Sequence, residues 1–187
     1  MPFQATVSGQ IGFGVVGELF LEGPLRAQPA RLDSADAANN VVGRAFSVVS
    51  GGTGSWTANG DAVNPAPMVA EAGGNGPFAG ILANPKVYVS GGTVAGGTLA
   101  PTLTLPDGTM AELVQETAGI IVALPALAAV GDAVYYLQAD GTLVTTAPGA
   151  LAPASSVGPI GNVARYTSTG AGLAVISMPF VPVTVTA

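Results

Sequence analysis

The sequence predicts an all-β protein: a small barrel or sandwich of short antiparallel strands, with an extended N-terminal arm and long Gly/Pro-rich loops. Two observations lead to this prediction. First, 27 Gly and 15 Pro residues divide the 187-residue chain into short segments. Second, these segments are apolar or alternating, as strands are, and only short windows at 111–116 and 124–130 fit a helical period.

The N-terminal region is expected to be extended. Residues 3–22 are rich in Val, Phe and Gly, and Gly23-Pro24 then opens the segment GPLRAQPARLDS. Pro24 and Pro29 fix φ, which favours a polyproline-II-like arm laid against a partner or a neighbouring subunit, with a flexible surface loop as the alternative. We therefore expect an N-terminal strand and arm at 1–40 and a barrel or sandwich domain at 41–187, forming one structural unit.

The middle of the chain contains three predicted strands, 41–50, 81–90 and 98–105, separated by turn clusters. The Gly/Asn/Pro-rich stretch 51–80 indicates a long loop or a run of short hairpins. Pro106-Asp107-Gly108 then forms a turn, after which Met110 to Gln115 is either a hairpin partner of the preceding strand or one turn of helix.

A hairpin is predicted around Asp140-Gly141, because Asp-Gly between apolar extended segments favours a two-residue type I′ turn. This turn places Leu137 opposite Val144 and Tyr135 opposite Thr146. Neither face of the hairpin is polar, so both faces must be covered. Further strands are expected at 160–166 and 172–178. The tail at 180–186 contains Pro182, which predicts an edge strand or a terminal arm.

Composition excludes several classes of function. Charged residues make up only 9% of the chain, the net charge is −6, and five Lys and Arg residues are a poor footprint for nucleic acid. The longest uncharged apolar run, 118–130, is shorter than the roughly 18 residues of a membrane helix. Histidine and cysteine are absent, so neither metal nor cofactor is expected. An apolar, weakly charged chain favours oligomerisation or docking on a large partner.

Motifs for catalysis are weak. Residues 12–17 match G-x-G-x-x-G, but Gly23-Pro24 follows too soon for the helix that a dinucleotide site needs. The pairs Glu112/Glu116 and Asp33/Asp36 are interpreted as solvated carboxylates. Lys86, the sole lysine, lies in strand-turn sequence and is expected to be an ordinary exposed residue. We therefore do not expect an enzyme.

Five segments stand out by their order along the chain: Val42–Phe46, Gly76–Lys86, Thr102–Thr109, Gly119–Val122 and Val130–Tyr136. Their order resembles that in the structural cement, or capsid decoration, proteins of tailed bacteriophages. The resemblance covers roughly residues 5–178. It implies a virion component on the outer surface of the capsid. Such a component binds at junctions between major capsid protein subunits and stabilises the expanded shell.

The candidate partner-contact residues are three arginines and four aromatics: Arg26, Arg31, Arg44, Phe46, Phe78, Tyr135 and Tyr136. For the aromatics the alternative is burial in the core, and for the arm arginines it is a solvated position without a contact. A homo-oligomer, dimer or trimer, is expected. A second hypothesis is a β-rich ligand-binding or host-adhesion module that uses Trp56, and a third is a hydrolase that depends on Lys86 or Glu112.

Overall fold

The chain is nearly all β, which confirms the predicted fold class. The computed structural model describes residues 14–20, 23–49, 56–58, 61–63, 68–84, 104–166 and 170–179. Its elements are β1 Leu25–Leu32, the 3-10 helix η1 Ala37–Asn39, β2 Ala45–Val48, β3 Trp56–Ala58, β4 Asp61–Val63, β5 Met68–Ala72, β6 Phe78–Leu82, β7 Met110–Leu124, β8 Ala133–Leu137, β9 Leu143–Thr146, β10 Ser156–Tyr166 and β11 Gly172–Met178. No helix in these ranges is long and apolar enough to cross a membrane.

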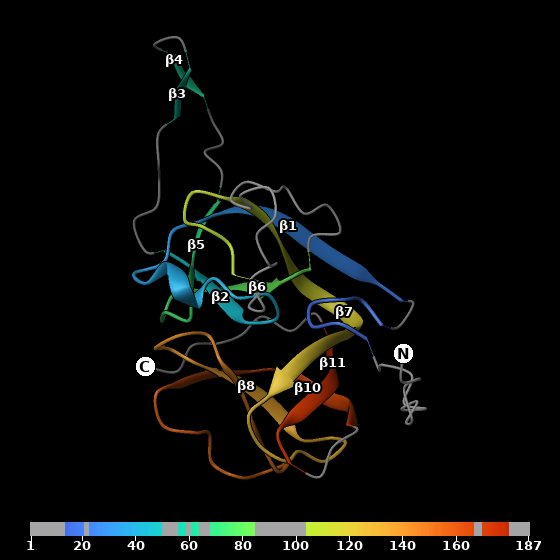
Figure 1. The fold of residues 1–187 in the computed structure, drawn as a ribbon. Coiled ribbons are helices and arrows are strands. Elements are labelled where there is room, and N and C mark those ends of the chain that lie inside the picture. The colour runs from blue at the N-terminus through green and yellow to red at the C-terminus, as the bar shows by residue number, and fades with distance from the viewer. Residues whose placement is uncertain are drawn as a thin grey trace, which may run out of the picture.

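Nine strands form one sheet in the order β1-β5-β2-β6-β7-β11-β10-β8-β9, and β1 also pairs with β7. The first five strands therefore close into a ring, which forms the first lobe. The second half of β7 pairs with β11, and β10, β8 and β9 follow in the order of the sheet. These strands form the second lobe (Figure 1). All pairings are antiparallel except that of β1 with β5. The strands β3 and β4 pair with each other in a separate two-stranded sheet.

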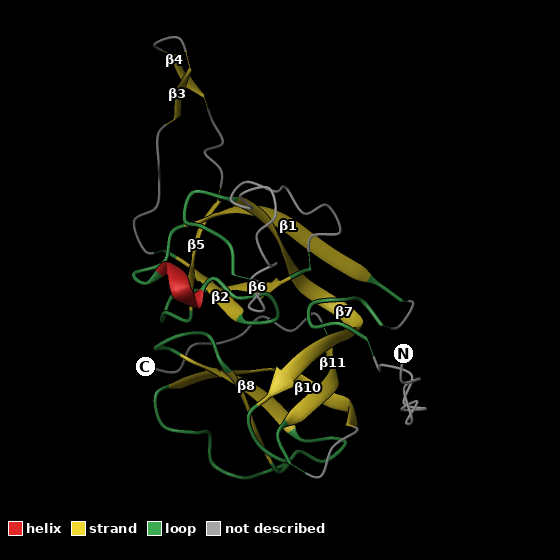
Figure 2. Ribbon diagram, viewed as in Figure 1, coloured by secondary structure: helices red, strands yellow, loops and turns green. Residues whose placement is uncertain are grey.

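Strand β7 belongs to both lobes, as Figure 2 shows. Its residues 110–117 pair with β1, and its residues 117–124 pair with β11. Side chains alternate across a strand, so neighbours point to opposite faces. Leu113 accordingly packs into one core cluster and Val114 into the other. A 15-residue strand that is buried on both faces along most of its length holds the two lobes together.

The protein has two hydrophobic core clusters, and the second also takes in the first-lobe residues Ala45, Ile81 and Val114. The first is built around Leu32, Phe46, Leu82 and Leu113, which are fully buried. The second is larger and is built around Ile120, Tyr136, Leu143 and Ile176, also fully buried. Burying a side chain of this size stabilises the fold by roughly 1.5–3 kcal/mol relative to leaving it exposed, so both cores contribute substantially.

The segment expected to be a polyproline-II-like arm is instead strand β1. It pairs with β7 from Leu25 to Arg31 and with β5 from Ala30 to Leu32. Among the described residues, only β7 pairs with the strand up to Pro29, so the missing N–H of this proline interrupts no second ladder there. Ala30 and Leu32 are 0% exposed. The proline-rich segment is therefore part of the first lobe, and its prediction as an arm is wrong.

The predicted hairpin exists between β8 and β9, but its register differs. The structure pairs Tyr135 with Val144 and Tyr136 with Leu143, so the loop has four residues instead of two. Only Gly141 has a positive φ there, +74°, so the turn is not type I′. A shift of two residues keeps every side chain on its predicted face. Val134, Tyr135 and Tyr136 are all buried, which confirms that both faces are covered.

Other predictions have mixed outcomes. The strand at 172–178 and the Pro106-Asp107-Gly108 turn are confirmed, and the strand predicted at 160–166 begins earlier, at Ser156. Within 51–80 the sequence missed β5, and the window 111–116 is strand, not helix. Thr104 bridges Val41, so it does not pair with 110–115 as expected. Residues 1–13, 85–103 and 180–187 lie outside the described residues.

Candidate functional site

The junction between the two lobes is held by backbone hydrogen bonds. The N–H of Ala45, at the start of β2, donates to the carbonyl of Gly141 in the β8–β9 loop at 3.0 Å. The N–H of Gly73 donates to the Ala45 carbonyl at 3.0 Å, and the N–H of Gly74 donates to the Gln138 carbonyl at 2.8 Å. The β5–β6 turn and β2 of the first lobe are thus bonded directly to the hairpin loop of the second lobe.

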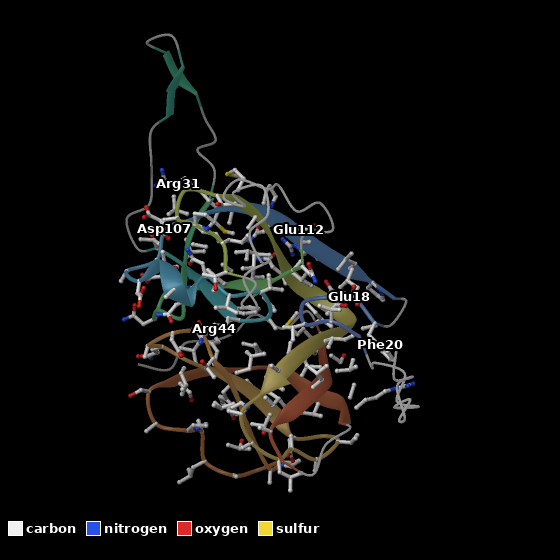
Figure 3. All side chains as sticks on the ribbon, viewed as in Figure 1. Glu18, Phe20, Arg31, Arg44, Asp107 and Glu112 are labelled. Carbon is white, nitrogen blue, oxygen red and sulfur yellow. The ribbon has the colours of Figure 1, made fainter. Side chains whose placement is uncertain are left out.

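Arg44 reinforces the same junction, and Figure 3 shows it at the boundary between the lobes. Its Nη1 donates to Asn39 Oδ1 at 2.8 Å and to the Asp140 carbonyl at 3.2 Å, and lies 3.6 Å from Asp140 Oδ2. Burial acts to raise the pKa of Asp140. Hydrogen bonds from the Thr142 hydroxyl and N–H, together with the Arg44 charge, outweigh burial and leave this pKa below its ordinary value.

A mainly apolar pocket of about 290 Å³ opens beside this junction. Its lining comes from first-lobe residues 41–44, the segment that carries Val16, the end of β7 and the start of β9. The lining residues are Val16, Val41, Val42, Gly43, Arg44, Ala123, Leu124, Pro125, Thr142 and Leu143. Arg44 is the one charged side chain among them.

The predicted aromatic contact residues belong to the core. Phe46 and Tyr136 are 0% exposed and Tyr135 is 8% exposed. Phe78 is partly buried and packs against the second core, with its ring centroid 5.9 Å from that of Tyr136. Burial leaves the Tyr136 hydroxyl without a hydrogen-bond partner and raises its pKa to about 12. The structure therefore places Phe46, Tyr135 and Tyr136 in the core, as the alternative interpretation expected, and leaves Phe78 partly exposed.

The predicted arginines lie at separate positions. Arg26 is exposed on β1, in register with Glu116. Arg31 forms an ion pair with Asp33 at 2.8 Å, and its side chain is 41% exposed. Figure 3 shows Arg31 in the first lobe, well away from Arg44 at the junction. The structure does not bring Arg31 and Arg44 together into a single cationic site.

Exposed large apolar side chains were not singled out from the sequence. One group, Val15, Leu19 and Leu25, follows the edge of β7, where Leu19 bridges Ile120 and Leu25 pairs with Thr117. A second group lies in second-lobe loops: Leu127 is 63% exposed, Val130 70% and Leu151 93%. The helix-like spacing within 124–130 and the lack of charge there are the only signals that the sequence offers.

The two carboxylate pairs singled out from the sequence lie in strands, an ion pair and a helix cap. Glu112 and Glu116 lie on β7 in register with β1, Asp33 pairs with Arg31, and Asp36 caps η1 by accepting from the Ala38 N–H. Gly14 and Gly17 lead into strand β1 and not into a helix, consistent with rejecting a nucleotide site. Within the described residues, no group of three acidic side chains could hold a metal ion. Lys86 and the Trp56 side chain lie outside the description.

Comparisons with known proteins identify the family. The model of the family described as structural cement protein (E217 gp24/Pam3 gp6) matches residues 3–178. No curated protein matches the sequence. A chain in the solved structure "The capsid of Myoviridae Phage XM1" is similar with a TM-score of 0.57 and 15% identity, over 96% of this chain and 99% of that chain, which is a likeness of fold. Since the family model spans nearly the whole sequence, the chain belongs to the family of phage structural cement proteins.

Proposed function

We propose that this cement protein binds the outer surface of the expanded phage capsid at junctions between major capsid protein subunits. It bridges neighbouring subunits there, as a homo-oligomer, and thereby stabilises the shell. The role is structural and needs no catalytic step. A protein that binds only the mature lattice stabilises that lattice by linkage, and many symmetric copies multiply a modest contact.

One observation carries this proposal: large apolar side chains are exposed on both lobes. Leu25 is 49% exposed beside the β7 edge, and Leu127 is 63% exposed in a second-lobe loop. Exposed apolar surface favours contact with another protein. Because Leu25 belongs to β1 of the first lobe and Leu127 to a loop of the second, a single copy offers an apolar surface on each lobe. Two surfaces are what bridging requires.

The junction supports the same conclusion. A bridge transmits load only if its two ends are rigidly connected. Here β7 runs through both lobes, and the backbone bonds at Ala45 and Gly141 fix the β8–β9 loop against β2. The net charge of −6 also suits a position on the outer surface, away from packaged DNA.

Co-sedimentation with expanded capsids that lack the protein tests this proposal. Leu25→Asp and Leu127→Asp place a charge on each apolar group, and Ala38→Asp is the control at an exposed position of η1. We expect each leucine variant to weaken binding at least tenfold, about 1.4 kcal/mol, and the control to bind as the wild type does. Removing residues 1–32 is unsuitable, because it removes β1 from the ring. Failure of the wild-type protein to sediment with capsids contradicts the proposal.

A further inference from the structure

Two loops of the second lobe, 125–132 and 147–155, join the same end of the β8–β9 hairpin. The first leads into β8 and the second follows β9, whose last residue, Thr146, pairs with Ala133 at the start of β8. The opposite end of the hairpin is bonded to the first lobe through the carbonyl of Gly141. Where they join the hairpin, the two loops therefore lie on the side of the second lobe that faces away from the first (Figure 1). We call them the apolar loops.

The apolar loops display large apolar side chains on a defined backbone. Leu127, Val130 and Leu151 are each more than half exposed. Val130 lies in a turn in which the Asp132 N–H donates to the Ala129 carbonyl at 3.1 Å, and the Ala129 N–H donates to the Asp132 carboxylate at 2.7 Å. A surface that is already ordered loses little conformational entropy when it binds. Exposed apolar side chains on such a surface favour contact with another protein.

Charge is almost absent from this part of the chain. Residues 117–187 contain two acidic residues and one basic residue, whereas residues 1–116 contain nine acidic and four basic residues. The three charged side chains have contacts of their own: Asp132 within its turn, Asp140 at the junction, and Arg165 at 5.4 Å from the centroid of an aromatic ring. Charged residues are depleted at the centre of protein interfaces, and the apolar loops have this composition.

The distribution of charge favours a second copy of this chain as the occupant. Two copies with a net charge of −6 each repel one another wherever their charged surfaces approach. A contact about a two-fold axis pairs a surface with itself. Apolar surface complements itself in such a contact. The exposed Leu25 of the first lobe, by contrast, adjoins Arg26 and its register partner Glu116, and would bring like charges together.

We infer that the apolar loops bind the same loops of a second copy, which forms a two-fold dimer. The two first lobes then lie at opposite ends of the dimer, and each presents the surface around Leu25 to a different capsid subunit. This inference rests on the proposed function, since it names the surface through which the cement protein self-associates. It also assigns the two apolar groups different partners: the capsid for the first lobe and a second copy for the second.

Sedimentation equilibrium of the full chain over a range of concentrations tests this inference. Val130→Asp and Leu151→Asp place a carboxylate on each apolar loop, and Leu25→Asp is the matched control at an exposed apolar residue of the first lobe. We expect the wild type to form dimers, the two loop variants to dimerise at least tenfold more weakly, and the control to dimerise as the wild type does. Added salt should strengthen dimerisation of the wild type, because it screens the repulsion between copies. Thermal melting verifies that each variant is folded.

Co-sedimentation with expanded capsids that lack the protein separates this inference from the proposed function. The loop variants should bind capsids more weakly, because single copies lose the gain from two linked contacts. Leu25→Asp should weaken capsid binding while its dimerisation is unchanged. A wild type that stays monomeric, or loop variants that dimerise normally, overturns the inference. If such loop variants still bind capsids poorly, the apolar loops contact the capsid instead. A wild type that dimerises but does not bind capsids overturns the proposed function.

Discussion

The guanidinium of Arg44 lies 3.6 Å from the carboxylate of Asp140, and this ion pair connects the two lobes. Arg44 precedes β2 in the first lobe, and Asp140 belongs to the β8–β9 loop of the second. The pair is only partly buried, so its own contribution to stability is modest. Its importance lies in its neighbours, because the backbone bond from the Ala45 N–H to the Gly141 carbonyl forms beside it. Substitutions at this junction therefore test how rigidly the two lobes are connected.

Gly141→Ala is expected to destabilise the protein strongly. Gly141 has φ +74°, and an added Cβ would collide with the backbone carbonyl of Ala45. Gly149 is the matched control, since it has φ +80° and an added Cβ there would meet nothing. The left-handed conformation alone costs about 1 kcal/mol for alanine, and we expect about 3 kcal/mol or more at Gly141. Denaturant unfolding measures the loss of stability in both variants. Equal losses in Gly141→Ala and Gly149→Ala would show that the junction accommodates the added Cβ without cost.

Asp140→Asn is expected to change how the free energy of unfolding depends on pH in the acidic range. The pKa of Asp140 is lowered in the folded state, so the carboxylate contributes stability above its unfolded pKa of about 4. That contribution is lost as pH falls through the folded pKa. The variant should therefore be less stable than the wild type at pH 7, by roughly 1 kcal/mol, and the difference should vanish at low pH. Denaturant unfolding from pH 7 to pH 2 measures the difference in the free energy of unfolding between the variant and the wild type. A difference that stays constant over this range would contradict the lowered pKa of Asp140.

Tyr136→Phe is expected to be neutral or stabilising, by up to about 1 kcal/mol. The hydroxyl is buried without a partner, so its removal relieves a desolvation cost while the ring stays packed on Phe78. The raised pKa, about 12, means that the folded state favours the neutral phenol. The wild type should lose stability as pH rises from about 10 towards 12, and the variant should lose less. A clear loss of stability in the variant at pH 7 would indicate an unseen partner for the hydroxyl.

Asn40 and Asp107 are expected to be energetically coupled. The buried Asn40 amide donates to Asp107 Oδ1 at 2.7 Å and its Oδ1 accepts from the Ser34 hydroxyl at 2.6 Å, tying the β1–β2 connection to the Pro106-Asp107-Gly108 turn. Asn40→Ala should cost about 2 kcal/mol, because it leaves these groups without their partner. A double-mutant cycle with Asp107→Ala should show a coupling of about 0.5 kcal/mol or more. Strict additivity would mean that the two side chains act independently.

The sequence predicted what local patterns determine. Gly172 to Met178 is a strand with the predicted bounds, and the turn at Pro106-Asp107-Gly108 is present because a Gly with positive φ suits it. Asp140-Gly141 was located as a hairpin loop but with the wrong register. The cause is a side-chain contact: Asp140 Oδ1 accepts the Thr142 N–H at 2.9 Å, which leaves Asp140 out of the pair of positive-φ residues that a type I′ turn requires.

Long-range pairing could not be predicted. Pro24 and Pro29 gave residues 23–34 the pattern of an arm, yet β7 and β5 pair with residues 25–32 and bury Ala30 and Leu32. The two halves of β7 were predicted as separate elements, because nothing local shows that Met110 and Leu124 belong to one strand. The pocket was missed for the same reason, since Val16, Arg44, Ala123 and Leu143 come together only in the folded chain.

Thermal melting of expanded capsids, with increasing amounts of the purified protein, tests the central claim most directly. A cement protein that bridges subunits of the mature lattice must raise the melting temperature of the shell. The rise should continue with the logarithm of free protein concentration above Kd, as linkage requires. Leu25→Asp and Leu127→Asp should require higher concentrations for the same rise. An unchanged melting temperature on capsids that sedimentation shows to be saturated would mean that the protein decorates the shell without stabilising it.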